Sequence, residues 1–194
     1  MTWFKNYDFK TLECMYLNEL KFYSKIIDIG DATKFDYCRY CYLSILLTQL
    51  RNGARLSEAT DAIVNFYYNG NINQNVKVRK KKQTDYRLII IPREIERSKL
   101  EYVDNLIDDY EIKHKKISAW VKKYFSRTKN MDLNTHTNRH ACITYLALNN
   151  TNPLDIQGIT KHSKLNMIME YVHQTKGNEI LKRLNKVDED DRRY

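Results

Sequence analysis

Hydrophobic positions recur three and four residues apart along most of the chain, the spacing that places them on one face of an α-helix. The first such stretch begins near Asp8 or Thr11, either of which can cap a helix, and it ends near Gly30. The second begins near Lys34 and ends at Gly53, because glycine suits the left-handed conformation that often closes a helix. The chain is therefore predicted to start with two helices.

The hydrophobic pattern changes in the middle of the chain to short runs rich in β-branched and aromatic residues. These runs are residues 63–68, 76–80 and 86–91, and short polar links separate them. Links of this kind favour antiparallel neighbours. We therefore expect a small three-stranded antiparallel sheet.

Helical spacing returns after the predicted sheet. Pro92 can open a helix that extends to Leu106, and an apolar stripe over residues 117–125 predicts another whose stripe packs in the core. Later helices are expected to begin near Thr137, whose hydroxyl can cap one, and at Pro153. Only two prolines and five glycines interrupt the chain, which also favours a mainly helical α+β fold.

The charge of the chain indicates a polyanionic partner. Its 194 residues, enough for one domain, include 33 Lys and Arg against 24 Asp and Glu, a formal net charge of +9. No apolar run approaches the ~18 residues that suggest a membrane helix, and the start of the chain lacks the apolar core of a signal peptide. We expect a cytoplasmic protein whose partner is nucleic acid rather than a membrane.

The four cysteines, Cys14, Cys38, Cys41 and Cys142, are too few and too scattered for a disulfide framework. Cys38 and Cys41 form a C-x-x-C pair, but no second pair of ligands lies nearby in the sequence. We interpret all four as reduced thiols.

Two histidines and an arginine, His136, Arg139 and His140, fall on a single helical turn. This stretch alone leaves three interpretations open, of which the first is a surface cluster without a function. The second is a zinc site, because the histidines have helical i, i+4 spacing, although Thr137 replaces the expected glutamate and Arg139 would repel a dication. The third is an anion site in which Arg139 binds a phosphate through two hydrogen bonds.

Another arginine, Arg55, lies just before the predicted N-cap residue of a short helix, Ser57. Backbone N–H groups at a helix start and a guanidinium can converge on one phosphate, whereas the alternative is a solvated arginine in a turn. The link between the second and third predicted strands is basic, and its side chains can enter a DNA groove or discourage strands of other molecules from pairing. These residues are Arg79, Lys80, Lys81 and Lys82.

Taken in chain order, these features resemble the catalytic domain of the tyrosine recombinases, the lambda-integrase-like enzymes. The matching positions are Arg55, the hairpin lysines, His136-x-x-Arg139-His140, Lys161-His162 and Tyr171. The resemblance extends from about Tyr7 to His173 and includes Ile156-Gln157 and Val172-His173. It implies the tyrosine recombinase catalytic fold.

Three positions depart from the family pattern. Thr160-Lys161-His162 stands where the family usually has Leu-Gly-His, Asn52 replaces the usual Thr before Gly53, and Asn138 replaces the Leu before Arg139. None of these changes removes a functional group.

The resemblance implies roles for the main site residues. Arg55 and Arg139 would bind the scissile phosphate, and Tyr171 would attack it to give a 3′-phosphotyrosyl bond and a free 5′-hydroxyl. His136 would exchange a proton with the tyrosine, and His162 would hydrogen-bond the phosphate.

Further residues would support the reaction. Lys81 would protonate the leaving 5′-oxygen, with Lys80 and Lys82 as alternatives because the register of the turn is open. Glu58 would orient the side chains of the site, and His140 would support the site without contacting the phosphate. The expected DNA contacts are Arg79, Lys80, Lys82, Lys161 and Lys164.

The resemblance also implies an organisation for the chain. Residues 1–178 would form the catalytic domain. Too few residues precede Lys34 for the family's separate core-binding domain, which leaves two alternatives: that domain was cut away, or this is a minimal enzyme. Residues 179–194 would form a helix and an acidic tail that either cover the chain's own core or dock on a neighbouring protomer. We expect a homotetramer on two DNA sites and a monomer or dimer without DNA.

The implied function is site-specific recombination or integration of DNA, in a mobile element or virus, with no cofactor and no metal ion. Two alternatives remain from the sequence. One is strand nicking and closing like that of a type IB topoisomerase, and the other is a non-catalytic DNA-binding regulator on the same fold.

Overall fold

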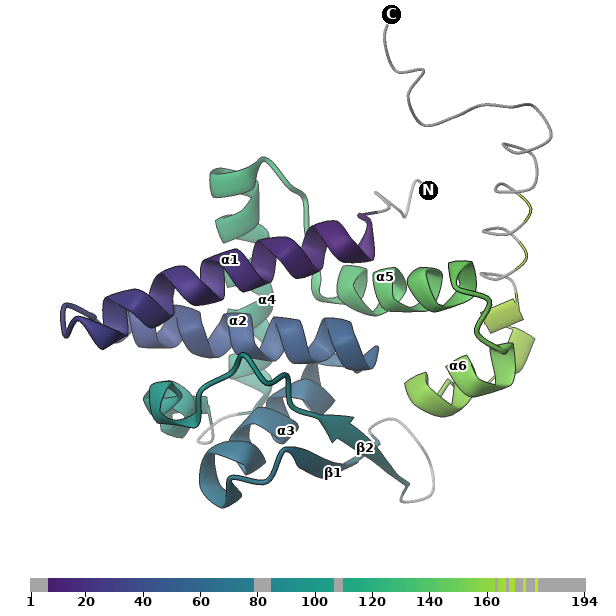
Figure 1. Cartoon of the computed structure of the whole chain (residues 1–194), viewed down its shortest axis with the longest axis horizontal. Coiled ribbons are helices and arrows are strands. Elements are labelled where there is room, and N and C mark those ends of the chain that lie inside the picture. Colours follow the sequence, from purple (N-terminus) through teal and green to yellow (C-terminus); the bar gives the residue numbers. More distant parts are fainter. Residues whose placement is uncertain are drawn as a thin grey trace, which may run out of the picture. The chain divides into compact units, whose positions relative to one another are not determined.

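The computed structural model describes residues 7–78, 85–106 and 110–162, together with residues 164–166, 168–169, 173 and 177. Figure 1 shows the elements in chain order. They are α1 (Phe9–Asp28), α2 (Lys34–Asn52), α3 (Leu56–Asn69), β1 (Asn73–Lys77), β2 (Tyr86–Ile90), the 3₁₀ helices η1 (Arg97–Lys99) and η2 (Glu101–Leu106), α4 (Tyr110–Lys129), α5 (Thr135–Leu148) and α6 (Pro153–Thr160). The chain divides into two compact units, Met1–Cys142 and Ile143–Tyr194. The prediction of a mainly helical fold with a small antiparallel sheet is confirmed.

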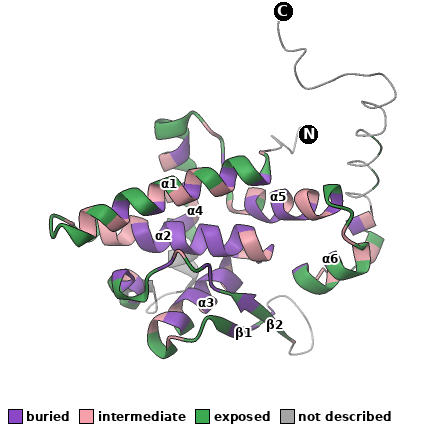
Figure 2. Cartoon of the chain, in the orientation of Figure 1, coloured by how far each residue is buried: buried purple, intermediate pink, exposed green. Residues whose placement is uncertain are grey.

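Helix α2 lies at the centre of the first unit. All its residues from Tyr40 to Leu50 are buried, as Figure 2 shows along this helix, and both α1 and α3 pack against it. A helical stretch that is buried on all sides needs neighbouring elements on all sides. The predicted ends of both N-terminal helices are confirmed, because Asp8 caps α1 through Thr11 N and Gly53 closes α2 with a φ of 54°.

The apolar stripe of α4 packs in the core, as predicted. Ile117, Val121 and Phe125 are buried. Phe125 makes an edge contact with Tyr16 of α1, their ring centroids 5.7 Å apart. Aromatic pairs in this geometry add to the stabilisation that burial provides. The side chains of this stripe therefore serve to pack the core.

The predicted strand over residues 63–68 is wrong, because this segment belongs to α3. Ala59, Ala62, Ile63 and Phe66 are buried at helical spacing. Packing of this face against α2 therefore outweighs the preference of β-branched and aromatic residues for strands. Among the described residues the sheet has two strands instead of three.

The two strands pair antiparallel, with Asn75 opposite Leu88. The predicted strand over residues 86–91 is confirmed as β2, whereas β1 begins earlier than the predicted residues 76–80. Side chains alternate between a buried and an exposed face, and Arg87 lies on the buried face with Ile89. The strand thus places a charged side chain inside the first unit.

The α-helix predicted to follow Pro92 is also wrong. The segment up to Leu106 forms the two short 3₁₀ helices η1 and η2. Hydrogen bonds to other parts of the chain compete with a continuous helix here. Glu96, for example, donates its backbone N–H to Tyr40 Oη at 2.9 Å.

The second unit contains the end of α5 and all of α6. Ile143, Ala147, Ile156 and Ile168 form a small apolar core. The predicted start of α6 at Pro153 is confirmed, and Asn152 caps this helix through Leu154 N. All four cysteines are free thiols, as predicted. No helix in the described part of the chain is both long and apolar enough to cross a lipid bilayer.

Candidate active site

The candidate site forms where α2 ends and α3 begins. Gly53 ends α2 in the left-handed conformation, and the chain enters α3 at Leu56, so the N-cap residue is Arg55. The prediction of Ser57 as N-cap is therefore wrong. The carboxylate of Glu58 makes the capping contact instead, because it accepts a hydrogen bond from Arg55 N at 3.0 Å.

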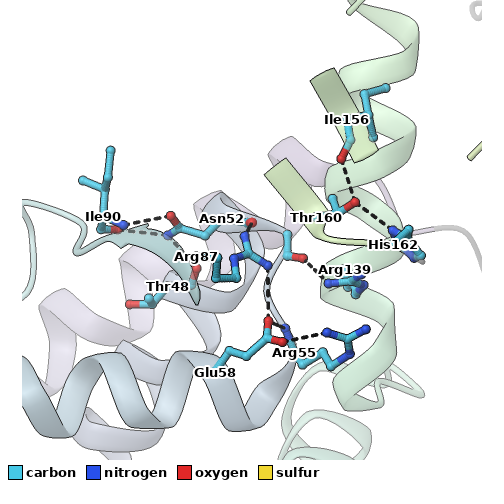
Figure 3. Close-up of polar contacts among 11 residues, drawn as sticks. Thr48, Asn52, Arg55, Glu58, Arg87, Ile90, Arg139, Ile156, Thr160 and His162 are labelled. Atoms are coloured by element: carbon cyan, nitrogen blue, oxygen red, sulfur yellow. Dashed lines mark hydrogen bonds and ion pairs between the residues drawn. The ribbon is translucent and has the colours of Figure 1, made fainter. Parts of the chain in front are cut away.

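Glu58 joins two arginines from different elements (Figure 3). Its Oε1 atom accepts a hydrogen bond from Arg55 Nη1 at 2.7 Å, and its Oε2 atom accepts one from Arg87 Nη1 at 3.2 Å. The carboxylate is fully buried, and burial alone would raise its pKa. The hydrogen bonds from Arg55 and the charge of Arg87 outweigh burial, so the pKa of Glu58 lies below its ordinary value.

Arg139 reaches the same region from α5. It is buried, and its Nη1 atom donates to Gly53 O at 2.7 Å. Burial, with the charges of Arg55 and Arg87, lowers the pKa of Arg139 to about 10, partly opposed by Glu58. Three guanidinium groups and one carboxylate therefore meet around the end of α2. A partly buried cluster with excess positive charge is suited to binding an anion.

Sequence reasoning missed Arg87. Its Nη2 atom donates to Asn52 O at 2.5 Å, and burial lowers its pKa while the charge of Glu58 opposes this. Its neighbours Tyr86, Leu88, Ile89 and Ile90 are all apolar or aromatic, so the pattern does not show which face of the strand is buried. The sequence feature that could have identified Arg87 is its position as a single charged residue inside an apolar run.

His136 and His140 lie on the first turns of α5. Asn134, rather than the predicted Thr137, caps this helix, because its Oδ1 atom accepts from His136 N at 2.9 Å and from Thr137 N at 3.1 Å. His136 is exposed. His140 is half-buried, and burial, with the charges of His136 and Arg139, lowers its pKa. The described residues include no cluster of three potential metal ligands.

Asn52 and Asn138 connect the elements that surround the site. Asn52 pairs with the backbone of Ile90, accepting from its N–H at 3.0 Å and donating to its carbonyl at 2.9 Å. Asn138 is buried, accepts from Tyr16 Oη at 2.7 Å and donates to Gln49 Oε1 at 3.1 Å. These contacts fix β2 and α5 to α2 within the first unit.

His162 lies in the second unit, directly after α6. Its Nδ1 atom is 2.7 Å from Thr160 Oγ1, and that hydroxyl donates its proton to Ile156 O at 2.6 Å (Figure 3). The hydroxyl must then accept from His162, which places the ring proton on Nδ1. Thr160 therefore orients the histidine.

Lys161 occupies the left-handed conformation that closes α6, with a φ of 55°. Replacing it with glycine is expected to raise the free energy of unfolding by roughly 0.5–1 kcal/mol, because glycine adopts this conformation without steric cost. Urea unfolding measures the change. Lys122→Gly, at an exposed position inside α4, should not stabilise the protein, and a destabilised Lys161→Gly variant would contradict the explanation.

The structure brings Arg55, Glu58 and Arg139 together in the first unit, while His162 and the exposed Lys164 belong to the second. The roles predicted for all of them stay predictions. Several further predicted residues lie outside the described residues. They are Tyr171, Arg79, Lys80, Lys81 and Lys82, together with the predicted helix and tail over residues 179–194.

Comparison with known proteins gives three relatives. "Uncharacterized protein MJ0770" of Methanocaldococcus jannaschii is 33% identical over 212 residues, covering 97% of this chain and 91% of that protein. "Putative integrase ORF241" of Acidianus two-tailed virus is 34% identical over 143 residues, 74% of this chain and 56% of that protein. "Putative integrase V10" of Sputnik virophage is 27% identical over 180 residues, 79% of this chain and 76% of that protein.

No family model and no solved structure matches the chain. The two viral relatives, both of which carry the name "putative integrase", indicate an integrase-like group of proteins. The match to MJ0770 exceeds 30% identity and extends over almost all of both chains. The chain therefore belongs to the same family as MJ0770.

Proposed function

We propose that the protein is a tyrosine recombinase, a site-specific DNA recombinase or integrase that cuts and rejoins strands through a 3′-phosphotyrosyl intermediate. The observation that carries the proposal is the meeting of Arg55 and Arg139, far apart in sequence, at the end of α2. The names of the viral relatives and the order of Arg55, His136, Arg139, His162 and Tyr171 along the chain support it.

The arginines supply the charge that this reaction needs. A phosphodiester under in-line attack places negative charge on its two non-bridging oxygens, so catalysis depends mainly on positioning and on charge stabilisation. Arg55 is held by Glu58, yet a quarter of its side chain remains accessible, 26% by area. Arg139 is held by Gly53 O. Guanidinium groups fixed in advance need little rearrangement when the transition state forms.

The nucleophile of the proposal is the Tyr171 hydroxyl. A phenol with a pKa of about 10 is only ~0.1% ionised at neutral pH, so a base must take its proton, and His136 is assigned this role. The tyrosyl oxygen bonds to phosphorus while the bond to the 5′-oxygen breaks, and Lys81 protonates that leaving oxygen. His162 hydrogen-bonds the phosphate.

The phosphotyrosyl ester preserves the energy of the broken bond, so rejoining needs no ATP. In reverse, the 5′-hydroxyl of the incoming strand attacks phosphorus and displaces the tyrosine. The proposal includes a homotetramer that holds two DNA duplexes, because complete exchange between two duplexes cuts four strands and each cut uses one tyrosine. Double-stranded DNA is the substrate and no cofactor takes part.

The test is covalent capture of DNA. The protein is incubated, in a buffer containing a metal chelator, with a pool of nicked duplexes whose central sequence is randomised. Adducts that survive detergent are then recovered and sequenced. The expected result is an adduct joined through a DNA 3′-phosphate and enriched in one sequence. Absence of any adduct, while the same pool is bound in a filter-binding assay, would exclude the proposed reaction.

A second measurement separates recombination from topoisomerase activity. Two duplexes that carry the enriched sequence should exchange strands, and the joined products can be counted by sequencing. Relaxation of one supercoiled circle without exchange between duplexes would instead assign the protein a nicking and closing activity.

A further inference from the structure

Arg87 is a buried charge that the resemblance did not assign. Only 2% of its side chain is exposed, and it shares the buried face of the sheet with Val76 and Ile89. Its two terminal nitrogens bond to Glu58 Oε2 and to Asn52 O, whereas its Nε atom has no hydrogen-bond partner among the described residues.

A contribution to fold stability does not by itself explain why an arginine occupies position 87. Removing a guanidinium from water is costly, and a buried ion pair often stabilises a fold no better than apolar side chains of similar volume. The unpartnered Nε atom adds to this cost. The surrounding face is apolar at Val76, Ile89 and Ile91, so an apolar residue would suit the packing.

The partners of Arg87 are the groups that place the two candidate phosphate-binding arginines. Glu58 bonds to both the backbone N–H and the guanidinium of Arg55. Asn52 directly precedes Gly53, whose carbonyl oxygen holds Arg139. One guanidinium therefore contacts both sides of the turn that connects α2 to α3 (Figure 3).

We infer that Arg87 is a positioning residue of the proposed reaction, acting through Glu58 and Asn52 to hold Arg55 and Arg139 in place for a phosphate. The inference rests on the proposed function. Arg87 also shares the single carboxylate with Arg55, so Glu58 orients Arg55 without cancelling the positive charge of the cluster. Arg87 is itself buried, and we assign it no contact with DNA.

The experiment compares Arg87→Met, Arg87→Lys and wild type in single-turnover cleavage of a nicked duplex at saturating DNA. Arg87→Met should slow adduct formation about 100-fold, the size of effect expected when catalytic groups are displaced by about 1 Å. Its DNA dissociation constant should change less than about threefold, because the phosphate contacts remain. Arg87→Lys should restore part of the rate, because an ammonium can bond Glu58 but cannot form the same fork.

Lys99 provides the matched control, because it is also a buried cation, with Asp28 and Glu96 as partners at 2.8 Å. Lys99→Met should lower the melting temperature without slowing cleavage. All rates are measured well below the lowest melting temperature of the set. If Arg87→Met does not fold, the test rests on Arg87→Lys. A cleavage rate of Arg87→Lys at least about threefold below the wild-type rate then supports the inference.

Wild-type cleavage by both Arg87 variants would show that Arg87 only stabilises the fold, and would overturn the inference while the proposed function stands. Equal slowing in Lys99→Met would also overturn it, because the rate would then follow stability alone. Absence of an adduct with the wild-type protein would overturn the proposed function, and this inference with it.

Discussion

Replacing Tyr171 with phenylalanine is expected to abolish the covalent protein–DNA adduct and to leave DNA affinity within about twofold of wild type. The phenylalanine ring has no oxygen with which to form the phosphotyrosyl bond, so the effect is a loss of product rather than a slower rate. Affinity depends on contacts with the DNA phosphates, which the substitution leaves in place. A labelled nicked duplex, run on a denaturing gel after incubation, measures the adduct.

The control is Tyr86→Phe, which removes the hydroxyl of an exposed tyrosine on β2. This variant should form the adduct at the wild-type level. An undiminished adduct from Tyr171→Phe would show that another side chain is the nucleophile. Fifteen tyrosines make the control necessary, because most of them are expected to be packing residues.

Replacing Glu58 with glutamine is expected to lower the free energy of unfolding by about 3 kcal/mol, at the lower end of the range for breaking a buried ion pair. The substitution leaves the buried guanidinium of Arg87 without a countercharge, close to the charges of Arg55 and Arg139. We expect a loss of unfolding free energy at the lower end of that range because Arg55 is partly exposed and water can solvate it. Urea unfolding followed by circular dichroism measures the loss.

The pH dependence of this effect has a definite sign. Folding lowers the pKa of Glu58, so its ionised form adds stability that is fully present above the ordinary pKa of a glutamate. That contribution is lost as the pH falls through the lowered value. The difference in stability between wild type and Glu58→Gln should therefore be largest at neutral pH and should shrink in acid below the ordinary glutamate pKa.

Glu94→Gln is the matched control for this prediction. Glu94 pairs with Arg51 through two hydrogen bonds of 2.7 and 3.0 Å, but both side chains are partly exposed. Loss of this ion pair should lower the free energy of unfolding by about 1 kcal/mol, because water can solvate Arg51 once its partner is neutral. Equal losses in the two variants would contradict the view that burial makes Glu58 critical.

The sequence by itself determined the features that depend on neighbours along the chain. Asp8 and Gly53 mark helix ends because capping involves atoms only a few residues apart. The pairing of Arg55 with Glu58 across one turn at the start of α3 is equally local. For the same reason, the spacing of His136 and Arg139 was sufficient to predict that both lie on one helix, which is α5.

Only the tertiary structure decided the features that depend on distant partners. Residues 63–68 have strand-like composition, yet they lie in α3 because their apolar face packs on α2. Arg87 enters the site because pairing with β1 fixes which face of β2 is buried. No local signal specifies that choice, since apolar residues lie on both faces of the strand. Glu58 and the end of α2 complete the environment that makes a buried arginine stable there.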